Sequence, residues 1–289
     1  MNGFQNTIIT ADNIDDLVRQ GVQHILKYGE RIDTRSGPGI QAYTTTYVLT
    51  DPTARIHTLR APQSVQYLAR ELQAYFIGSQ NVEDGLAQAA PLWRTLSDPD
   101  GNVCSNYGYY VFHQQTPFGI TQFDWVRECF KKNRYTRKAF ININDISHKT
   151  DTKDFPCTIG LQFFLRGSIM NCEVASRSTD VITGLPYDMG FFSLVNELVA
   201  GAVGADLGED IQTGYTAMAA NFTQIYDKTA AKAQEVLKTE VDRSSQKMPP
   251  VTDALASLAD IMEIKNRPPK TDVIRWVTDS ANLPIAYEA

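Results

Sequence analysis

The chain has few cysteines and no long apolar run. Its four cysteines, Cys104, Cys129, Cys157 and Cys172, show neither a Cys-x-x-Cys metal or redox spacing nor the density of a disulfide-stabilised secreted domain. We therefore predict reduced thiols and no metal site. No apolar stretch reaches about 18 residues, and the N-terminus lacks a signal-peptide pattern. These absences predict a cytoplasmic protein without a membrane segment.

Positive charge is also scarce. The 289 residues include 27 Lys and Arg against 33 Asp and Glu, which gives a net charge of −6. A protein that coats a nucleic-acid polymer needs a basic face to neutralise phosphates, so a polymer partner is not expected. One free nucleotide needs only a local cluster of arginines and is compatible with this balance. The hydrophobic content of 43% is enough for a sizeable core.

Periodicity predicts scattered helices and strands. Apolar residues recur at helical spacing in 11–30, on a face that includes Leu26, and again in 61–78, 121–138 and 190–208. Strands are predicted at 41–51, 139–145, 156–167 and 168–181, and a Gly/Pro loop at 31–40. This mixture predicts an α+β fold in a single domain, 1–289. A change in composition at 244–250 precedes a divergent helical tail.

Three residues allow both a structural and a chemical interpretation. Cys157 follows a proline at the head of a strand, where it is a buried structural thiol or a nucleophile whose pKa is lowered by nearby cations. The cations considered are Arg35, Arg137, Lys138 and Arg177.

The other two are carboxylates. Glu71 borders an apolar helical stripe, so it either pairs with Arg70 or lines a cavity with a raised pKa. Asp188 precedes a long apolar segment, so it either caps a helix or contacts a substrate. The residues alone do not choose between these interpretations.

Several motifs resemble the thymidylate synthase family in order and spacing, over roughly residues 10–230. The core match comprises Pro156-Cys157, Gln162-Phe163, Arg177-Ser178-Thr179-Asp180-Val181 and Gly184-Leu185-Pro186. Upstream, "TRSGPG" resembles the family's phosphate loop, "RELQAYFIGSQNV" its catalytic-glutamate helix and "SNYGYYVF" its active-site tyrosine motif. "YTRKAFI" resembles the segment that reaches into the partner's site, with Lys138 in place of the second arginine.

The resemblance implies a mixed sheet packed by helices, a sheet-mediated homodimer and 5,10-methylenetetrahydrofolate as co-substrate. It implies catalytic roles for Cys157, Glu71, Asp188 and Tyr107. It implies nucleotide binding by Arg35, Arg137, Lys138, Arg177, Ser178, Gln162 and Asp188, with Arg137 and Lys138 acting across the dimer interface. It implies folate contacts for Asp180, Trp93 and Tyr187.

Departures from the family pattern bear on the substrate. Synthases that act on uracil carry Asn where Asp188 stands, whereas phage deoxycytidylate hydroxymethylases carry Asp. The family has His where Thr158 stands, and its His-x-Tyr pair, which holds the sugar, is expected at Ala217 and Ala219. These differences favour hydroxymethylation of CMP. The alternatives are hydroxymethylation of dCMP, a uracil-acting synthase and a nucleotide-binding protein that has lost catalysis.

Overall fold

The computed structural model describes residues 6–240 and 247–283. A seven-stranded mixed sheet has the order β1-β3-β7-β6-β5-β4, with β2 paired to β3. The strands are β1 (Thr7–Ala11), β2 (Glu30–Thr34), β3 (Gly37–Leu49), β4 (Phe140–Asn142), β5 (Thr158–Arg166), β6 (Ile169–Asp180) and β7 (Gln212–Tyr226). The β1–β3 and β6–β7 pairs are parallel and the other pairs are antiparallel, which confirms the predicted mixed α+β fold.

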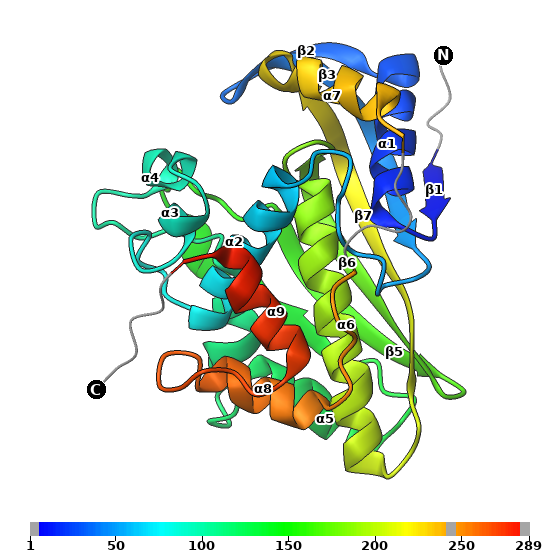
Figure 1. The fold of residues 1–289 in the computed structure, drawn as a ribbon, viewed down its shortest axis with the longest axis vertical. Helices are drawn as coiled ribbons and strands as arrows, with labels where there is room; N and C mark the ends of the chain where they lie inside the picture. The colour runs from blue at the N-terminus through cyan, green and yellow to red at the C-terminus, as the bar shows by residue number, and fades with distance from the viewer. Residues whose placement is uncertain (1–5, 241–246, 284–289) are drawn as a thin grey trace.

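Helices pack on one face of this sheet (Figure 1). The longer ones are α1 (Ile14–Tyr28), α2 (Gln63–Ile77), α5 (Gln122–Lys132), α6 (Leu185–Leu207), α7 (Ala230–Lys238), α8 (Ala254–Met262) and α9 (Asp272–Ala281). Shorter elements are α3 (Leu86–Ala89), α4 (Leu92–Leu96), a π-helical turn (Tyr109–His113) and two 3-10 turns (Ile146–His148 and Asp227–Thr229).

The amphipathic patterns produce α1 and α2 nearly as predicted. Asn13 caps α1 by accepting the Asp16 backbone N–H, but Leu26, expected on the buried face, is 40% exposed. In α2 the apolar stripe is buried and Gly78, at φ 69°, ends the helix in the left-handed conformation that glycine adopts without strain.

The predicted loop at 31–40 is wrong. Residues 30–34 form β2, which pairs with the start of β3 in an antiparallel hairpin closed at Thr34 and Gly37. Gly37 has a φ of 113°, which a residue with a side chain rarely adopts, so the Gly/Pro composition marks a tight turn. The hairpin places Arg35 and Ser36 at its tip.

The apolar helix α6 begins at Leu185, five residues before the predicted start at Gly190. It is long and apolar enough to cross a membrane by length and composition, contrary to the sequence-based expectation, but 78% of that apolar window is buried within the structure. Its position between the sheet and α8 is that of a core helix.

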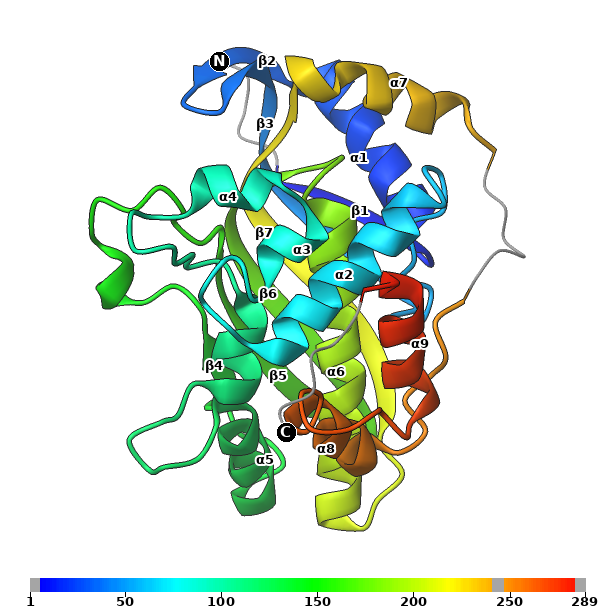
Figure 2. The same cartoon turned by 60° about the vertical axis from the view of Figure 1, so that its left-hand side comes forward.

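The tail adds a further layer. The composition change predicted at 244–250 lies partly outside the described residues, which resume at 247. Met248 is buried against Arg55, then α8 packs on α6 and α9 packs on α2 (Figure 2). The helix that carries Glu71 is therefore covered from outside by the last described helix.

Candidate active site

A cavity of about 470 Å³ opens between the β2–β3 hairpin, α2, the start of α6 and the ends of β6 and β7. Ten of the thirteen predicted site residues line it: Arg35, Glu71, Trp93, Tyr107, Cys157, Arg177, Ser178, Asp180, Tyr187 and Asp188. These residues come from segments spread over more than 150 positions of the chain, so the fold brings together what the motifs predicted.

Cys157 sits immediately before β5 and is fixed through its backbone. Its carbonyl accepts hydrogen bonds from the Arg177 N–H (2.9 Å) and the Ser176 hydroxyl (3.2 Å). The Ser178 hydroxyl donates to its sulfur at 3.7 Å. The β5–β6 pairing therefore holds the thiol at a defined point of the cavity wall.

Among the described residues, the guanidinium that acts on this thiol is that of Arg177. Arg177 donates to the carbonyls of Phe155 (2.8 Å) and Pro156 (3.2 Å), so it also anchors the segment that leads into Cys157. Burial raises the pKa of Cys157, and the opposing effects of Arg177 and Ser178 do not overcome it. The pKa of Cys157 is thus raised, which agrees with the buried-thiol interpretation and not with a pKa lowered by nearby cations.

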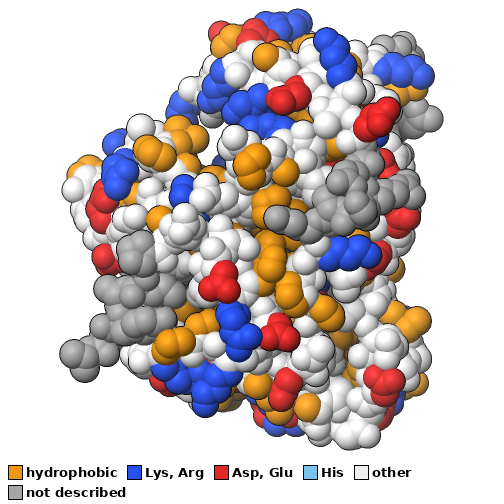
Figure 3. Space-filling view, in the orientation of Figure 1, with side chains coloured by type: hydrophobic (Ala, Val, Ile, Leu, Met, Phe, Trp, Pro, Cys, Tyr) orange, Lys and Arg blue, Asp and Glu red, His pale blue; other side chains and the backbone are white. Residues whose placement is uncertain are grey.

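Arg35 reaches the cavity from the hairpin tip. It donates to the Lys153 carbonyl at 2.8 Å, which joins the hairpin to the loop before Cys157. Lys and Arg side chains gather at the end of the molecule that carries β2 and α7 (Figure 3). Two cations line the cavity itself, Arg35 and Arg177, and both are suited to hold a phosphate.

Glu71 is 5% exposed and points into the cavity, as the second interpretation predicted. It does not pair with Arg70, whose guanidinium instead donates to the Ala281 carbonyl at 3.0 Å. The Tyr67 hydroxyl donates to Glu71 Oε1 at 2.9 Å. Burial, followed by the nearby charge of Asp188, raises the pKa of Glu71 to about 8.

Asp188 does not cap α6. The N-cap is Gly184 and Pro186 lies within the first turn, so Asp188 is already inside the helix. Its side chain is half-buried in the cavity wall, and burial raises its pKa to about 7. Near pH 7 each of the two carboxyls, Asp188 and Glu71, can therefore be either protonated or ionised.

A family comparison agrees with this geometry. The model of the family described as thymidylate synthase matches residues 18–266. The chain belongs to the thymidylate synthase family. It is therefore a one-carbon transferase, methyl or hydroxymethyl, that acts on a pyrimidine nucleotide with methylenetetrahydrofolate as co-substrate. The match covers all thirteen predicted site residues and ends before α9.

Tyrosines surround the two carboxyls. The rings of Tyr67 and Tyr187 lie 4.5 Å apart, and those of Tyr75 and Tyr107 stack at 5.7 Å. Burial raises the pKa of each phenol, to about 12 for Tyr187, so all four keep their protons and can donate hydrogen bonds near neutral pH. The predicted site residue Tyr107 is part of this group.

The residues predicted to contact folate have the chemistry to hold a pterin ring. Trp93 and Tyr187 offer aromatic surfaces in the cavity wall, and Asp180 is 9% exposed. Asp180 Oδ1 accepts from two backbone N–H groups, whereas the buried Oδ2 has no hydrogen-bond partner. A pterin presents N–H donors and a flat ring, so these residues could hold it.

The alignment of the family's His-x-Tyr pair with Ala217 and Ala219 is wrong. Neither Ala217 nor Ala219 lines the cavity; Ala217 instead pairs with Glu173, further along β7. The strand reaches the cavity through Phe222, Gln224 and Tyr226.

Gln224 was missed by the sequence analysis. It is 5% exposed, and its amide oxygen has no partner. The buried Thr179 hydroxyl is unpartnered as well. Buried polar atoms without partners in a cavity indicate a polar ligand. The sequence contains one indication of this role. Gln224 and Tyr226 have the spacing of the family's His-x-Tyr pair, and Tyr226 matches the tyrosine of that pair.

Three predicted binding residues lie outside the cavity of their own chain. Arg137 and Lys138 are exposed before β4, and their carbonyls accept from Gln162 Nε2 (3.4 Å) and Trp125 Nε1 (3.2 Å). Gln162 lies in β5, next to β4. None of the three can bind a ligand in this cavity from its present position.

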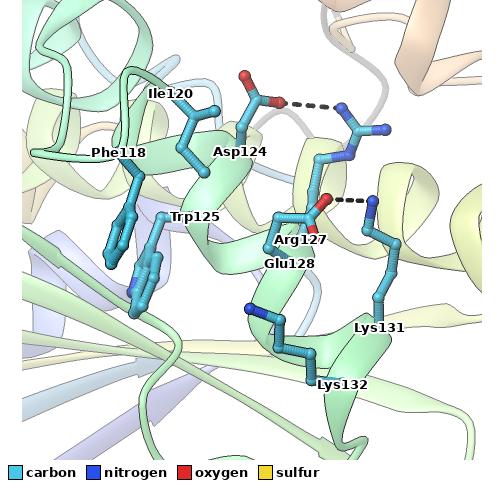
Figure 4. A pocket seen from close by; sticks show the side chains of 8 residues that line it. All are labelled: Phe118, Ile120, Asp124, Trp125, Arg127, Glu128, Lys131 and Lys132. Carbon is cyan, nitrogen blue, oxygen red and sulfur yellow. Dashed lines mark hydrogen bonds and ion pairs between the residues drawn. The ribbon is translucent and has the colours of Figure 1, made fainter.

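A second hollow of about 400 Å³ lies along α5, away from the cavity (Figure 4). Asp124 pairs with Arg127 and Glu128 with Lys131, while Phe118 stacks on Trp125 at 5.7 Å. Most of its charges are therefore neutralised within the helix.

Proposed function

We propose that this thymidylate synthase family member is a cytidylate 5-hydroxymethylase. It would transfer a one-carbon unit from 5,10-methylenetetrahydrofolate to C5 of CMP and add water, giving 5-hydroxymethyl-CMP and tetrahydrofolate. The observation that carries the proposal is Asp188, a cavity-lining carboxyl whose pKa is raised to about 7, where uracil-acting synthases carry an amide.

The chemistry of Asp188 suits cytosine. Cytosine presents an N4–H donor beside an unprotonated N3, whereas uracil presents an O4 acceptor beside an N3–H. A carboxyl can accept from N4–H with one oxygen and share a proton with N3 through the other. With a pKa of about 7, Asp188 can carry that proton at neutral pH. It can then give the proton to N3 as negative charge develops on the ring.

Cys157 and Glu71 supply the remaining chemistry. The Cys157 thiolate would add to C6, which makes C5 nucleophilic. The folate supplies the carbon. Glu71 would then take a proton from the water that adds to this carbon, as its pKa of about 8 allows.

Nucleotide binding would use both ends of the cavity. Arg35, Arg177 and Ser178 would hold the phosphate, and Gln224 would contact the sugar. A side-chain amide offers an acceptor and donors, which match the adjacent 2′- and 3′-hydroxyls of ribose. We propose CMP in place of dCMP because of this match, and no longer because of Ala217 and Ala219, which do not line the cavity.

We further propose a homodimer in which Arg137 and Lys138 complete the partner's phosphate site. The sheet face turned away from α1 exposes Tyr43 and Phe222, 38% and 42% exposed, whose rings contact edge to face. No helix of the described residues covers this face. A second copy would bury it and bring the exposed Arg137 to the neighbouring cavity.

Hydroxymethylation of dCMP is the alternative within the same reaction, and a catalytically inactive nucleotide-binding protein is the alternative from another class. The sequence motifs resemble those of the CMP hydroxymethylase of mildiomycin biosynthesis, and on this resemblance we propose CMP as substrate and a role in antibiotic biosynthesis in the cytoplasm.

One incubation separates these functions. The protein is mixed with methylenetetrahydrofolate and, separately, CMP, dCMP, UMP and dUMP, and the products are analysed by mass. We expect a hydroxymethyl product from CMP above all. A methyl product from dUMP would identify a synthase, a preference for dCMP would select the deoxynucleotide enzyme, and absence of any product with retained CMP binding would indicate lost catalysis.

A further inference from the structure

Glu71 is one end of a three-residue hydrogen-bond chain. Trp93 Nε1 in α4 donates to the Tyr67 hydroxyl at 3.3 Å, and this hydroxyl lies 2.9 Å from Glu71 Oε1. Tyr67 and Glu71 are four residues apart on α2, so they lie on one face of the helix. The Tyr67 ring also packs on Tyr187, which limits its movement.

The direction of this chain is fixed by its members. An indole N–H can only donate, so the Tyr67 oxygen accepts from Trp93. Among the described residues the only acceptor recorded for the Tyr67 proton is Glu71 Oε1, and burial keeps the phenol protonated. Oε1 is therefore held as an acceptor, which leaves the other carboxyl oxygen, Oε2, to carry any proton that Glu71 takes up.

We propose that Tyr67, oriented by Trp93, is a positioning residue that confines the exchangeable proton of Glu71 to Oε2. The inference rests on the proposed function for its role in the reaction. In that reaction a water oxygen bonds to the methylene carbon on C5 and its proton passes to Oε2. The electron pair of the exocyclic double bond moves into the C5–C6 bond, and the Cys157 sulfur leaves C6 as thiolate.

The surroundings make this assignment specific. The titratable groups that face Glu71 are Tyr67 and Tyr75 from α2, with Tyr187 and Asp188 from α6. The hydrogen bonds from Tyr67 and Tyr75 both favour the ionised form of Glu71, against the effects of burial and Asp188. Loss of the Tyr67 hydroxyl should therefore raise the pKa of Glu71 further and remove the donor that holds Oε1, while the Tyr75 hydrogen bond stays.

The test is the pH titration of the Glu71 carboxyl by infrared difference spectroscopy. Each protein is compared with its own Glu71→Gln counterpart, so the signal reports this group without turnover. In Tyr67→Phe, which keeps the ring against Tyr187, we expect a higher pKa of Glu71 and a changed carboxyl band. Tyr28→Phe, at an exposed position 60% accessible to solvent, should change neither.

Trp93→Phe provides a second, independent arm. It should shift the Glu71 titration when Tyr67 is present and leave it unchanged in the Tyr67→Phe background, because its effect passes through that hydroxyl. An unchanged titration in Tyr67→Phe, or equal effects of Trp93→Phe in both backgrounds, would overturn the inference.

Kinetics then relate the chain to the reaction. If CMP is the substrate, Tyr67→Phe should lower kcat about 10-fold or more and shift the pH profile, with little change in KM. An unchanged kcat and pH profile would contradict the role in water addition. Failure of the proposed function is recognised separately, because the mass analysis would then show no hydroxymethyl product while the infrared result stands.

Discussion

Replacement of Glu71 by Gln should stabilise the protein while it removes activity. Glu71 is buried and has no cation partner within residues 6–240 and 247–283, and its pKa is raised from the ordinary value of 4.5 to about 8. Between these values the unfolded chain is ionised at this position whereas the folded chain stays protonated. The wild-type protein therefore loses stability as pH rises through this window, and a neutral amide does not.

The magnitude follows from the width of the window. At ~1.4 kcal/mol per pH unit, the interval from 4.5 to 7 lowers the free energy of unfolding by about 3 kcal/mol at pH 7. The amide of Gln leaves one buried donor less well satisfied, which costs about 1 kcal/mol. The net gain expected for Glu71→Gln is about 2 kcal/mol, or roughly 5 °C in Tm for a chain of this size.

The assay is urea unfolding of the ligand-free proteins at pH 5 and pH 8, with Glu235→Gln on the exposed face of α7 as control. The gap between Glu71→Gln and wild type should widen from pH 5 to pH 8, and the control should show no such change. Equal stabilities at pH 8, or a gap independent of pH, would refute a buried carboxyl with a raised pKa at this position.

Four further outcomes are expected. Cys157→Ser should lower turnover by more than about 10³-fold while the calorimetric Kd for CMP stays nearly constant; normal turnover would remove covalent catalysis. Asp188→Asn should lose kcat/KM on CMP and gain it on UMP, by up to roughly 10⁴-fold between the two, and a variant that keeps its CMP activity would deny the base-reading role. Gln224→Ala should lower kcat/KM for CMP about 10-fold and lower it less for dCMP, which lacks the 2′-hydroxyl; an equal loss on both would show that Gln224 does not contact the 2′-hydroxyl. Mixed Arg137→Ala and Cys157→Ala chains should recover activity that each lacks alone, whereas an active monomer would exclude shared sites.

Much of the site could be predicted because linear motifs carry it. Helical periodicity gave the α2 stripe and hence the position of Glu71 beside it, and the order of motifs placed Cys157 and Arg177 in one site. These features depend on short-range spacing, which the sequence displays directly.

Other features depend on geometry that spacing does not encode. Asp188 looked like a cap because helix starts are expected at polar residues, but α6 begins at Leu185, after an N-cap residue, Gly184, that has no side chain to cap with. The pKa of Cys157 follows from how deeply the fold buries it, which no local pattern reveals.

The sugar contacts illustrate a third difficulty. Alternation along β7 is interrupted opposite Thr44, which has a φ of 45° and no ladder partner between the Tyr43–Phe222 and Thr45–Ala220 pairs. The register of β3 and β7 is the same on both sides of this point, but the burial pattern of β7 loses its strict period of two there. The position of Gln224 in the cavity therefore became visible only in three dimensions.

The order of strands has a consequence for synthesis on the ribosome. The N-terminal strands β1, β2 and β3 join the rest of the sheet only through β7, the last strand to be made. Until residue 226 has emerged, β3 lacks one neighbour and the cavity lacks the wall that Gln224 provides. Helix α2 is covered later still, once α9 at 272–281 has been synthesised. Such long-range pairing slows folding, and the nascent chain exposes open strand edges for most of its synthesis. We therefore expect CMP binding to arise only once nearly the whole polypeptide has been released.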